Sequence, residues 1–364
     1  MEIRLNRSEL VAELVPMQGI VERRTTIPVL SHLLLRAEDD QLKIAATDLE
    51  VSLTSSCGGE VKEDGAIAIQ AKKLLEIMRA GAGEDVTLRI DQEGMLTILV
   101  GQSHFKIRGL PAEDFPSLPA IDAEQATTIP FPTFRGMVGK VAFAISSEES
   151  RFQLSGALMK MGEDQLTLVA TDGHRLALVD SEIQGLEDSE GVLVPRKALH
   201  ELQRFDGDDL EFRKGEHHLS FSVGRRQLIC RILEGTFPDY ERVIAKDNDK
   251  TAQCSKAELS GVVQRVSLLT GDRARAVKVA LAEEGLEFSA TNPDLGEARE
   301  ELACEASGGT LAIGLNPDYM QQWLSAVETD QVQLQFKDEN SQCVAYPVDG
   351  DDQRYVCVIM PIRL

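Results

Sequence analysis

One short phrase recurs three times along the chain at nearly even spacing. It reads LKIAATDLEVSL at 42–53, LTLVATDGHRLALV at 166–179 and LEFSATNPDLGEARE at 286–300. The threonines that anchor the copies, Thr47, Thr171 and Thr291, lie 124 (171 − 47) and 120 (291 − 171) residues apart. These spacings are far longer than a solenoid repeat and match the commonest domain size. The 364 residues therefore predict three copies of one domain.

Each copy shows the same order of elements: a helix, strands that include the phrase, a second helix after a glycine, and further strands. In the opening segments, apolar residues recur at three- and four-residue spacing, which is typical of a helix with one buried face. Ser255 and Glu258 form a capping box, and Pro132 suits a first helical turn. The expected helices are 8–20, 71–80, 132–144, 196–205, 256–269 and 317–327.

The fold class that follows is α+β, with two helices packed on an antiparallel sheet in each domain. The polar segments 120–128 and 245–252 are the expected linkers. We therefore predict domain 1 over 1–122, domain 2 over 123–249 and domain 3 over 250–364.

Composition indicates a soluble cytoplasmic protein. No apolar run approaches the roughly 20 residues that a membrane span needs, and the acid-containing start lacks the apolar core of a secretory signal. The six cysteines have no C-x-x-C spacing, so reduced thiols are expected rather than disulfides or a zinc site. His217 and His218 lie in a turn-like stretch, and we expect no metal and no cofactor.

Two patterns could suggest catalysis. Asp172 and His174 could form the acid/base pair of a hydrolase, but no nucleophile or metal set accompanies them, and the other copies lack the histidine. The acidic strings 206–209 and 349–352 could hold two metal ions for DNA cleavage or synthesis, but they resemble turns. Three copies of one domain without a repeated catalytic cluster favour a protein that acts through its shape over an enzyme. We therefore expect no catalytic residues.

Five phrases carry a resemblance to a known family, the bacterial sliding clamps, which are the beta subunits of DNA polymerase III. They are RTTIPVL at 24–30, ATDGHRLAL at 170–178, LVPRK at 193–197, FPDYERV at 237–243 and MPIRL at 360–364. The resemblance covers the whole chain. It implies a non-catalytic homodimer, joined head to tail into a six-domain ring. The helices of this ring line a hole for double-stranded DNA, and the ring tethers the replicative polymerase.

The charge distribution is compatible with DNA in such a hole. The chain carries a net charge of −22, which by itself repels polyanions, but the six expected helices hold ten basic and six acidic residues. A ring needs only weak phosphate contacts, because its topology prevents escape. By resemblance the DNA contacts are Arg24, Lys72, Lys197 and the segment Ser147 to Arg151. An exposed helix end or loop is the competing explanation for each.

The resemblance also implies that the first domain of one copy pairs with the third domain of the other. The candidate edge in domain 1 is the strand around His104, Phe105 and Lys106. Its counterpart is the acidic stretch 297–301, with Leu268 and Leu269 nearby. A basic edge that meets an acidic edge fixes the register. For Glu297, Glu300 and Glu301, a solvated charge run on a loop stays open as the alternative.

A groove between the second and third domains is implied to capture short peptides from the polymerase III catalytic subunit, the clamp loader and other clamp-motif proteins. Apolar walls and a flexible methionine suit several partners. Core packing is an equal explanation for Leu154, Val243 and Val358, and Ala274 stands where family members often carry a bulkier side chain. The implied pocket residues are Leu154, Thr171, Gly173, His174, Arg175, Leu176, Pro238, Arg242, Val243, Asn316, Tyr319, Val358, Met360, Pro361, Ile362 and Arg363.

The sequence leaves two further alternatives open. A three-domain scaffold that binds peptides without ever encircling DNA is the competing function. The strong acidity is compatible with a high-salt habitat, and it is equally compatible with an outer wall that repels DNA.

Overall fold

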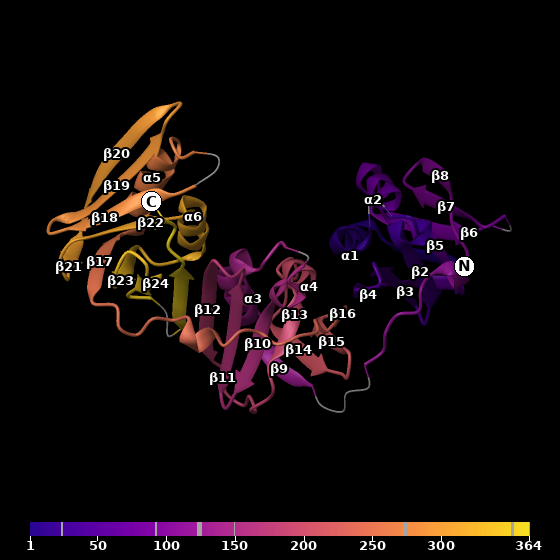
Figure 1. Ribbon diagram of the computed structural model, residues 1–364. Helices are drawn as coiled ribbons and strands as arrows, with labels where there is room; N and C mark the ends of the chain where they lie inside the picture. Colours follow the sequence, from indigo (N-terminus) through magenta and orange to yellow (C-terminus); the bar gives the residue numbers. More distant parts are fainter. Residues whose placement is uncertain are drawn as a thin grey trace. The chain divides into compact units, whose positions relative to one another are not determined.

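The computed structural model describes residues 1–22, 25–91, 93–121, 126–148, 150–271, 275–350 and 353–363 (Figure 1). The chain divides into two compact units. Unit 1 consists of Met1–Pro132 with Lys197–Ile232, and unit 2 consists of Thr133–Arg196 with Leu233–Leu364. Arg24, Glu149, the segment 272–274 with Ala274, Asp351, Asp352 and Leu364 lie outside the described residues, and so do the predictions made for them.

The helices that the periodicity predicts are present, with small differences at their ends. The expected helix 196–205 ends at Leu202, because Arg204 and Phe205 turn more tightly and donate their backbone N–H groups to Glu201 O and Leu202 O, each at 3.0 Å. Ser255 is the N-cap of its helix, as predicted, and accepts from Glu258 N at 3.4 Å. The helices are α1 (Arg7–Ile20), α2 (Ala71–Ala80), α3 (Phe131–Val141), α4 (Arg196–Leu202), α5 (Lys256–Ser267) and α6 (Pro317–Ala326).

The described residues of unit 1 form one sheet of 12 strands. Its main order is β8-β7-β6-β1-β4-β16-β15-β14-β9, while β3 lies between β4 and β2, and β5 pairs with β2. The strands are β1 (Glu2–Asn6), β2 (His32–Glu38), β3 (Gln41–Thr47), β4 (Val51–Glu63), β5 (Gly65–Gln70), β6 (Asp85–Ile90), β7 (Met95–Val100), β8 (Ser103–Arg108), β9 (Thr127–Pro130), β14 (Asp209–Lys214), β15 (His218–Val223) and β16 (Arg226–Arg231).

The described residues of unit 2 form two sheets, of nine and four strands. The larger has the order β13-β10-β11-β12-β25-β24-β23-β17-β21, and the smaller has the order β20-β19-β18-β22. The strands are β10 (Gly156–Gly162), β11 (Gln165–Thr171), β12 (Arg175–Glu182), β13 (Val192–Pro195), β17 (Lys250–Ser255), β18 (Val277–Ala282), β19 (Gly285–Asn292), β20 (Gly296–Ala303), β21 (Glu305–Ser307), β22 (Leu311–Leu315), β23 (Gln331–Phe336), β24 (Cys343–Val348) and β25 (Arg354–Ile359).

Every copy of the repeated phrase is an antiparallel hairpin. The hairpins are β3–β4, β11–β12 and β19–β20, and their anchoring threonines pair at the turn: Thr47 with Ser52, Thr171 with Leu176, and Thr291 with Glu297. The second strand of the first two hairpins also pairs with a strand from the next repeat, β4 with β16 and β12 with β25. Sheets therefore continue from one repeat into the next, and the compact units do not coincide with the repeats.

A buried carboxylate fastens α1 to the sheet of unit 1. Leu10, Leu14 and Met17 of α1 are fully buried, and Glu13 on the same helix is only 5% exposed. Its carboxylate accepts hydrogen bonds from Ser55 Oγ at 2.6 Å and from Arg226 Nε and Nη2 at 2.8 and 3.1 Å. Because a buried charge is tolerated only when it is paired, Arg226 holds α1 and β16 together.

The substitution Arg226→Ala is expected to lower the free energy of unfolding of unit 1 by roughly 3 kcal/mol, because it leaves Glu13 buried without its counter-charge. Hydrogen–deuterium exchange of the α1 and β16 amides measures the effect. The neighbouring Arg225→Ala, which removes an exposed guanidinium, should change the same amides by less than about 0.5 kcal/mol. Equal protection in both variants would show that the Glu13 pair does not stabilise this part of the fold.

The six cysteine thiols all lie within the described residues and are free; Cys304 is half-buried and the others are buried. Burial raises the pKa of the Cys57, Cys230, Cys254 and Cys343 thiols to about 12. Within the described ranges, His, Cys, Asp and Glu side chains do not gather in threes as a metal site requires. Among the same residues, no helix combines the length and apolar character that a membrane crossing needs.

Candidate functional site

Three segments of unit 2 that are far apart in the sequence meet at the junction between β12 and β25. In the sheet register Arg175 lies opposite Ile359. Beyond the strand ends, Met360 N donates to His174 O at 2.9 Å, and Ile362 N donates to Gly314 O at 2.8 Å. The predicted pocket segments 171–176 and 358–363 therefore lie side by side, next to β22 and the start of α6.

The turn between β11 and β12 is held by its own side chains. Thr171 Oγ1 donates to Arg175 O at 2.6 Å and accepts from Gly173 N at 3.1 Å. Asp172 Oδ1 accepts from the backbone N–H groups of His174 and Arg175, at 2.9 and 3.0 Å. Gly173 has φ +88°, a conformation that favours glycine. The turn thus presents an exposed His174 on a fixed backbone, and the Asp172 carboxylate serves the turn rather than the imidazole.

Arg175 is almost completely buried at the centre of this surface. Its Nε donates to Asp172 Oδ2 at 3.0 Å, and its Nη1 donates to Gln322 Oε1. The guanidinium lies 4.3 Å from the ring centroid of Tyr319 and 5.3 Å from that of Phe143, which are cation–π distances. Burial, with a smaller contribution from Asp172, raises the pKa of the Tyr319 phenol. These contacts fix the cation in one orientation and connect β12 to α6.

The sequence prediction missed two of these partners, Gln322 and Phe143. Gln322 lies three residues after Tyr319 on α6, so helical spacing could have placed both side chains on one face. No comparable signal marks Phe143, which follows α3 in the 3₁₀ turn Ala142–Ala144.

The predicted pocket residues fall into surface and core groups. Leu176 and Val358 are buried in a core cluster with Val169, Leu178 and Val356, and Val243 packs partly against it. Leu154 is also buried. Core packing is therefore the role that the structure shows for Val358 and Leu176. The pocket residues that keep more exposed surface are Gly173, His174, Pro238, Arg242, Met360 and Arg363, whereas Asn316, Tyr319, Pro361 and Ile362 are half-buried.

The predicted DNA contacts differ in how free their side chains are. Lys72 on α2 is 83% exposed and lies 3.9 Å from Glu76. Lys197 is half-buried, where its Nζ donates to Ile20 O at 2.9 Å and to Asp48 Oδ2. A lysine at the last carbonyl of α1 stabilises that helix end, so Lys197 has a structural role within unit 1.

The remaining predicted DNA contacts lie in unit 2. Ser147 is exposed. Arg151 reaches the β11–β12 turn, where its Nη1 donates to Asp172 O at 3.2 Å, and its Nε lies 3.3 Å from Glu148. Arg151 therefore adjoins the candidate peptide surface.

The net charge of the six helices is the same with the observed ends as with the expected ones. Arg7 belongs to the observed α1, and Arg204 lies beyond the observed end of α4. Some of these cations are used internally: Lys140 is buried and donates to Gln353 at 2.6 Å. Two exposed cations that the sequence prediction did not single out, Arg79 and Arg196, have guanidinium groups without a hydrogen bond or ion pair to any described residue.

Both strands predicted to meet at a dimer junction lie at sheet edges. In unit 1, β8 ends the sheet next to β7 (Figure 1). It exposes His104 and Lys106 while Phe105 is half-buried. Lys106 forms an ion pair with Asp91 at 2.6 Å, which raises the pKa of the lysine and lowers that of the carboxyl.

In unit 2, β20 ends the smaller sheet, with Glu297 and Glu301 exposed. Glu300 is already paired with Arg265 of α5, at 2.5 and 3.0 Å, and this contact lowers the pKa of its carboxyl. Leu268, directly after α5, is 75% exposed, and Leu269 is half-buried. Leu268 thus lies close to an open strand edge, where the addition of another strand could cover it.

Comparison with known proteins covers the whole chain. Residues 1–119, 128–239 and 241–363 match the family models of the N-terminal, central and C-terminal domains of the DNA polymerase III beta subunit. The beta sliding clamps of Pseudomonas aeruginosa and Escherichia coli are 34% and 32% identical to it, over 100% of each chain. The crystal structure of the DNA polymerase III subunit beta from Pseudomonas aeruginosa superposes with a TM-score of 0.94 at 33% identity, again over 100% of both chains.

These matches agree with the three hairpin repeats and the antiparallel sheets described above, and they confirm the resemblance that the sequence phrases indicated. The chain therefore belongs to the DNA polymerase III beta-subunit family, the non-catalytic sliding clamps that make DNA replication processive.

Proposed function

We propose that two copies of this chain join head to tail into a six-domain ring that encloses duplex DNA. The observation that carries the proposal is the pair of open strand edges, β8 in unit 1 and β20 in unit 2. One edge bears His104, Lys106 and Arg108, and the other is rich in glutamate. Antiparallel addition of one edge to the other satisfies the free backbone groups of both strands, and a closed head-to-tail ring repeats this pairing at each of its two junctions.

The helices face the DNA in this proposal, and the sheets form the outer wall. The proposed phosphate contacts are the predicted residues Arg24, Lys72, Ser147, Arg151 and Lys197, together with the exposed Arg79 and Arg196. Among them, Lys72, Arg79 and Arg196 are exposed cations with few internal contacts, which suit transient, sequence-independent binding to phosphates. A ring that holds DNA by enclosure needs no tighter contact than this.

The β12–β25 junction is the proposed docking site for peptides of the polymerase III catalytic subunit, the clamp loader and other clamp-motif proteins. His174, Met360 and the half-buried Ile362 provide the accessible surface, and the fixed Arg175 provides a polar anchor. Leu154, Leu176 and Val358 support this surface from below. Flexible methionine and mixed polarity allow several partners to use one site.

We propose domain limits after residues 122 and 249 and a cytoplasmic location, where a bacterial replication clamp meets its chromosome. The first limit falls between the first two family-model matches. The second precedes β17, which starts at Lys250, whereas the third family-model match already starts at residue 241.

Retention on circular DNA tests the ring. Loaded by a clamp loader onto nicked circular plasmid, the chain should co-elute with the plasmid on gel filtration, and it should be released when one restriction cut makes the plasmid linear. A peptide-binding scaffold that never encircles DNA would elute separately in both cases. Retention on linear DNA would instead show direct affinity for the duplex and contradict enclosure.

A further inference from the structure

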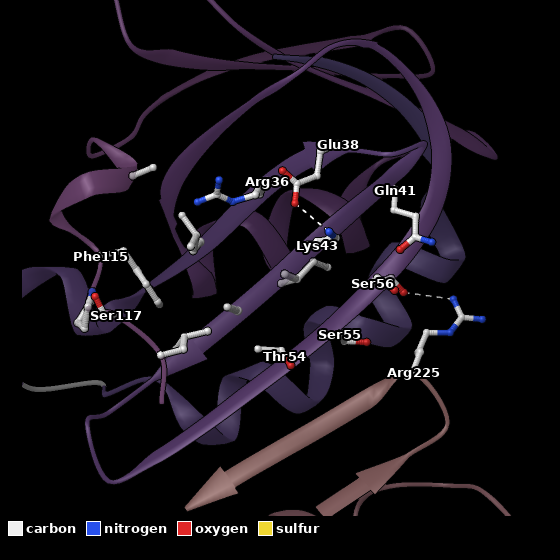
Figure 2. Close-up of a pocket in the computed structure, with 16 residues that line it drawn as sticks. Arg36, Glu38, Gln41, Lys43, Thr54, Ser55, Ser56, Phe115, Ser117 and Arg225 are labelled. Atoms are coloured by element: carbon white, nitrogen blue, oxygen red, sulfur yellow. Dashed lines mark hydrogen bonds and ion pairs between the residues drawn. The ribbon is translucent and has the colours of Figure 1, made fainter. Parts of the chain in front are cut away.

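A cavity of about 620 Å³ opens on the sheet of unit 1, far along the chain from the predicted peptide groove. It is lined by β2, β3 and β4, by the segment 112–118 and by Arg225 from the β15–β16 turn (Figure 2). Its volume lies within the range of ligand sites in proteins.

The cavity opens on the sheet face that is turned away from α1. Along β2, Leu33, Leu35 and Ala37 are fully buried, whereas the alternating residues Leu34, Arg36 and Glu38 line the cavity. Successive side chains of a strand point to opposite faces, so the cavity and the apolar core lie on different sides of β2. The helix side is the proposed DNA side, and the cavity is therefore placed to meet proteins rather than the enclosed duplex.

The wall of the cavity is cationic, although the chain is strongly acidic. Arg36, Lys43 and Arg225 line the cavity together with one carboxylate, Glu38, which is paired with Lys43 at 2.8 Å. Outside the lining, Lys43 lies 3.7 Å from Asp39, and Arg225 lies 4.0 Å from Glu9 of α1. Arg225 Nη1 donates to Ser56 O at 3.3 Å. Arg36 is exposed and makes no hydrogen bond or ion pair with any described residue. Its guanidinium is thus available for a carboxylate, which it can bind through two parallel N–H groups.

The opposite wall is apolar. Phe115 is buried in a small cluster with Val29, Leu30 and Ala45, and Leu34 and Leu118 pack against this cluster with part of their surface accessible. A ligand that fills the cavity therefore meets both a cation and an apolar surface.

The second repeat has a hollow at the same place, with the opposite charge. That cavity, of about 460 Å³, is lined by carboxylates from Asp180, Glu182, Asp188 and Glu241 against Lys160 and Arg354. The strand residues of the two linings correspond at the repeat spacing of 124: Lys160 to Arg36, Gly162 to Glu38, Gln165 to Gln41, Thr167 to Lys43 and Asp180 to Ser56. In the following loop the spacing is 122, because Phe237-Pro238 corresponds to Phe115-Pro116, so Tyr240 lies where the first repeat has Leu118. The repeated fold produces the hollow, and only the first repeat makes it cationic.

We propose that the unit 1 cavity is a second docking site, for a short peptide segment of a partner protein in which acidic and apolar side chains alternate. Arg36 and Arg225 bind the carboxylates, and Leu34, Phe115 and Leu118 receive an apolar side chain. Nucleic acid fits less well, because its phosphate backbone offers nothing for the apolar wall. The site is separate from the β12–β25 groove, so a partner could occupy either one.

Fluorescence anisotropy with the full-length chain and a fluorescein-labelled peptide of sequence EELEEL tests the proposal. We expect saturable binding that weakens about ten-fold in Arg36→Glu, where a carboxylate replaces the free guanidinium. The matched variant Lys160→Glu changes the equivalent residue of the second repeat and should bind as the unaltered chain does. Binding should also fall as salt rises, since the contact is partly electrostatic.

Three results would overturn the proposal. The first is absence of EELEEL binding to the unaltered chain. The second is equal weakening in Arg36→Glu and Lys160→Glu, or loss of binding on removal of residues 360–364, since either would place the peptide elsewhere. The third is displacement of EELEEL by the oligonucleotide dT12 with the same dependence on Arg36, which would assign the cavity to nucleic acid. None of these results depends on whether the ring closes around DNA.

Discussion

Removal of residues 360–364 is expected to reduce the stimulation of a DNA polymerase III to the level seen without this chain, while the dimer persists. Met360 is 38% exposed beside His174, and Ile362 forms an isolated antiparallel β-bridge with Gly314 of β22. The cut follows Ile359, the buried last residue of β25, so the core stays closed. The deletion therefore removes the peptide-docking surface and little of the fold. Primer extension on a primed circular template measures the stimulation, and light scattering measures the mass.

Met360→Leu is the control for this truncation, because a swap of similar volume keeps the surface apolar. It should leave stimulation within about two-fold of the unaltered chain, a difference of less than roughly 0.5 kcal/mol. A truncated chain that still stimulates fully would show that partner peptides dock elsewhere. A truncated chain that becomes monomeric would show that the C-terminus belongs to the ring junction.

Leu268→Glu is expected to convert the dimer to a monomer of 39.9 kDa. Leu268 is 75% exposed at the end of α5. Three residues earlier, Arg265 of α5 forms an ion pair with Glu300 of the edge strand β20. In the proposed ring this leucine is buried against β8 of the other copy. A carboxylate there would have to lose its hydration among apolar groups, which costs several kcal/mol. Sedimentation velocity measures the mass, and the loss of the ring should also abolish retention on circular DNA.

Leu49→Glu provides the matched control, since Leu49 is also exposed, at 59%, but lies in the β3–β4 turn, and β1, β6 and β7 separate β4 from the edge strand β8. This variant should remain dimeric. A monomeric Leu49→Glu variant would indicate that any added negative charge separates the copies. A dimeric Leu268→Glu variant would place the junction at another surface.

The helices and the family could be predicted from the sequence because both depend on local patterns. Apolar spacing located all six helices to within a few residues, and the ends differed where tight turns replaced the last helical bonds, as after Leu202. The repeated phrase marked three hairpins, since a strand, a polar turn and a second strand are contiguous in the chain. The position of β8 and β20 at sheet edges also agreed with the prediction.

The roles of individual side chains were less predictable. Lys197 appears in a basic phrase, yet its ammonium group binds Ile20 O and Asp48, residues about 150 or more positions away in the chain. Leu176 and Val358 belong to the predicted groove but are core residues beneath it. Arg175 owes its fixed position to Phe143, Tyr319 and Gln322, which no local spacing connects to it.

The same contrast holds for the chain as a whole. By itself the sequence determined that one domain occurs three times, which segments form helices and hairpins, and to which family the chain belongs. Periodicity and contiguous phrases can be recognised without knowledge of distant contacts. Only the tertiary structure decided that sheets run from one repeat into the next through β4–β16 and β12–β25, that Arg175 is enclosed, and that the hollows of the first two repeats carry opposite charge. The strand pairings and the contact of Arg175 with Gln322 join residues more than a hundred positions apart, and Arg225 and Arg354 reach the two hollows from similarly distant parts of the chain. Local sequence patterns do not indicate which of these distant residues come into contact.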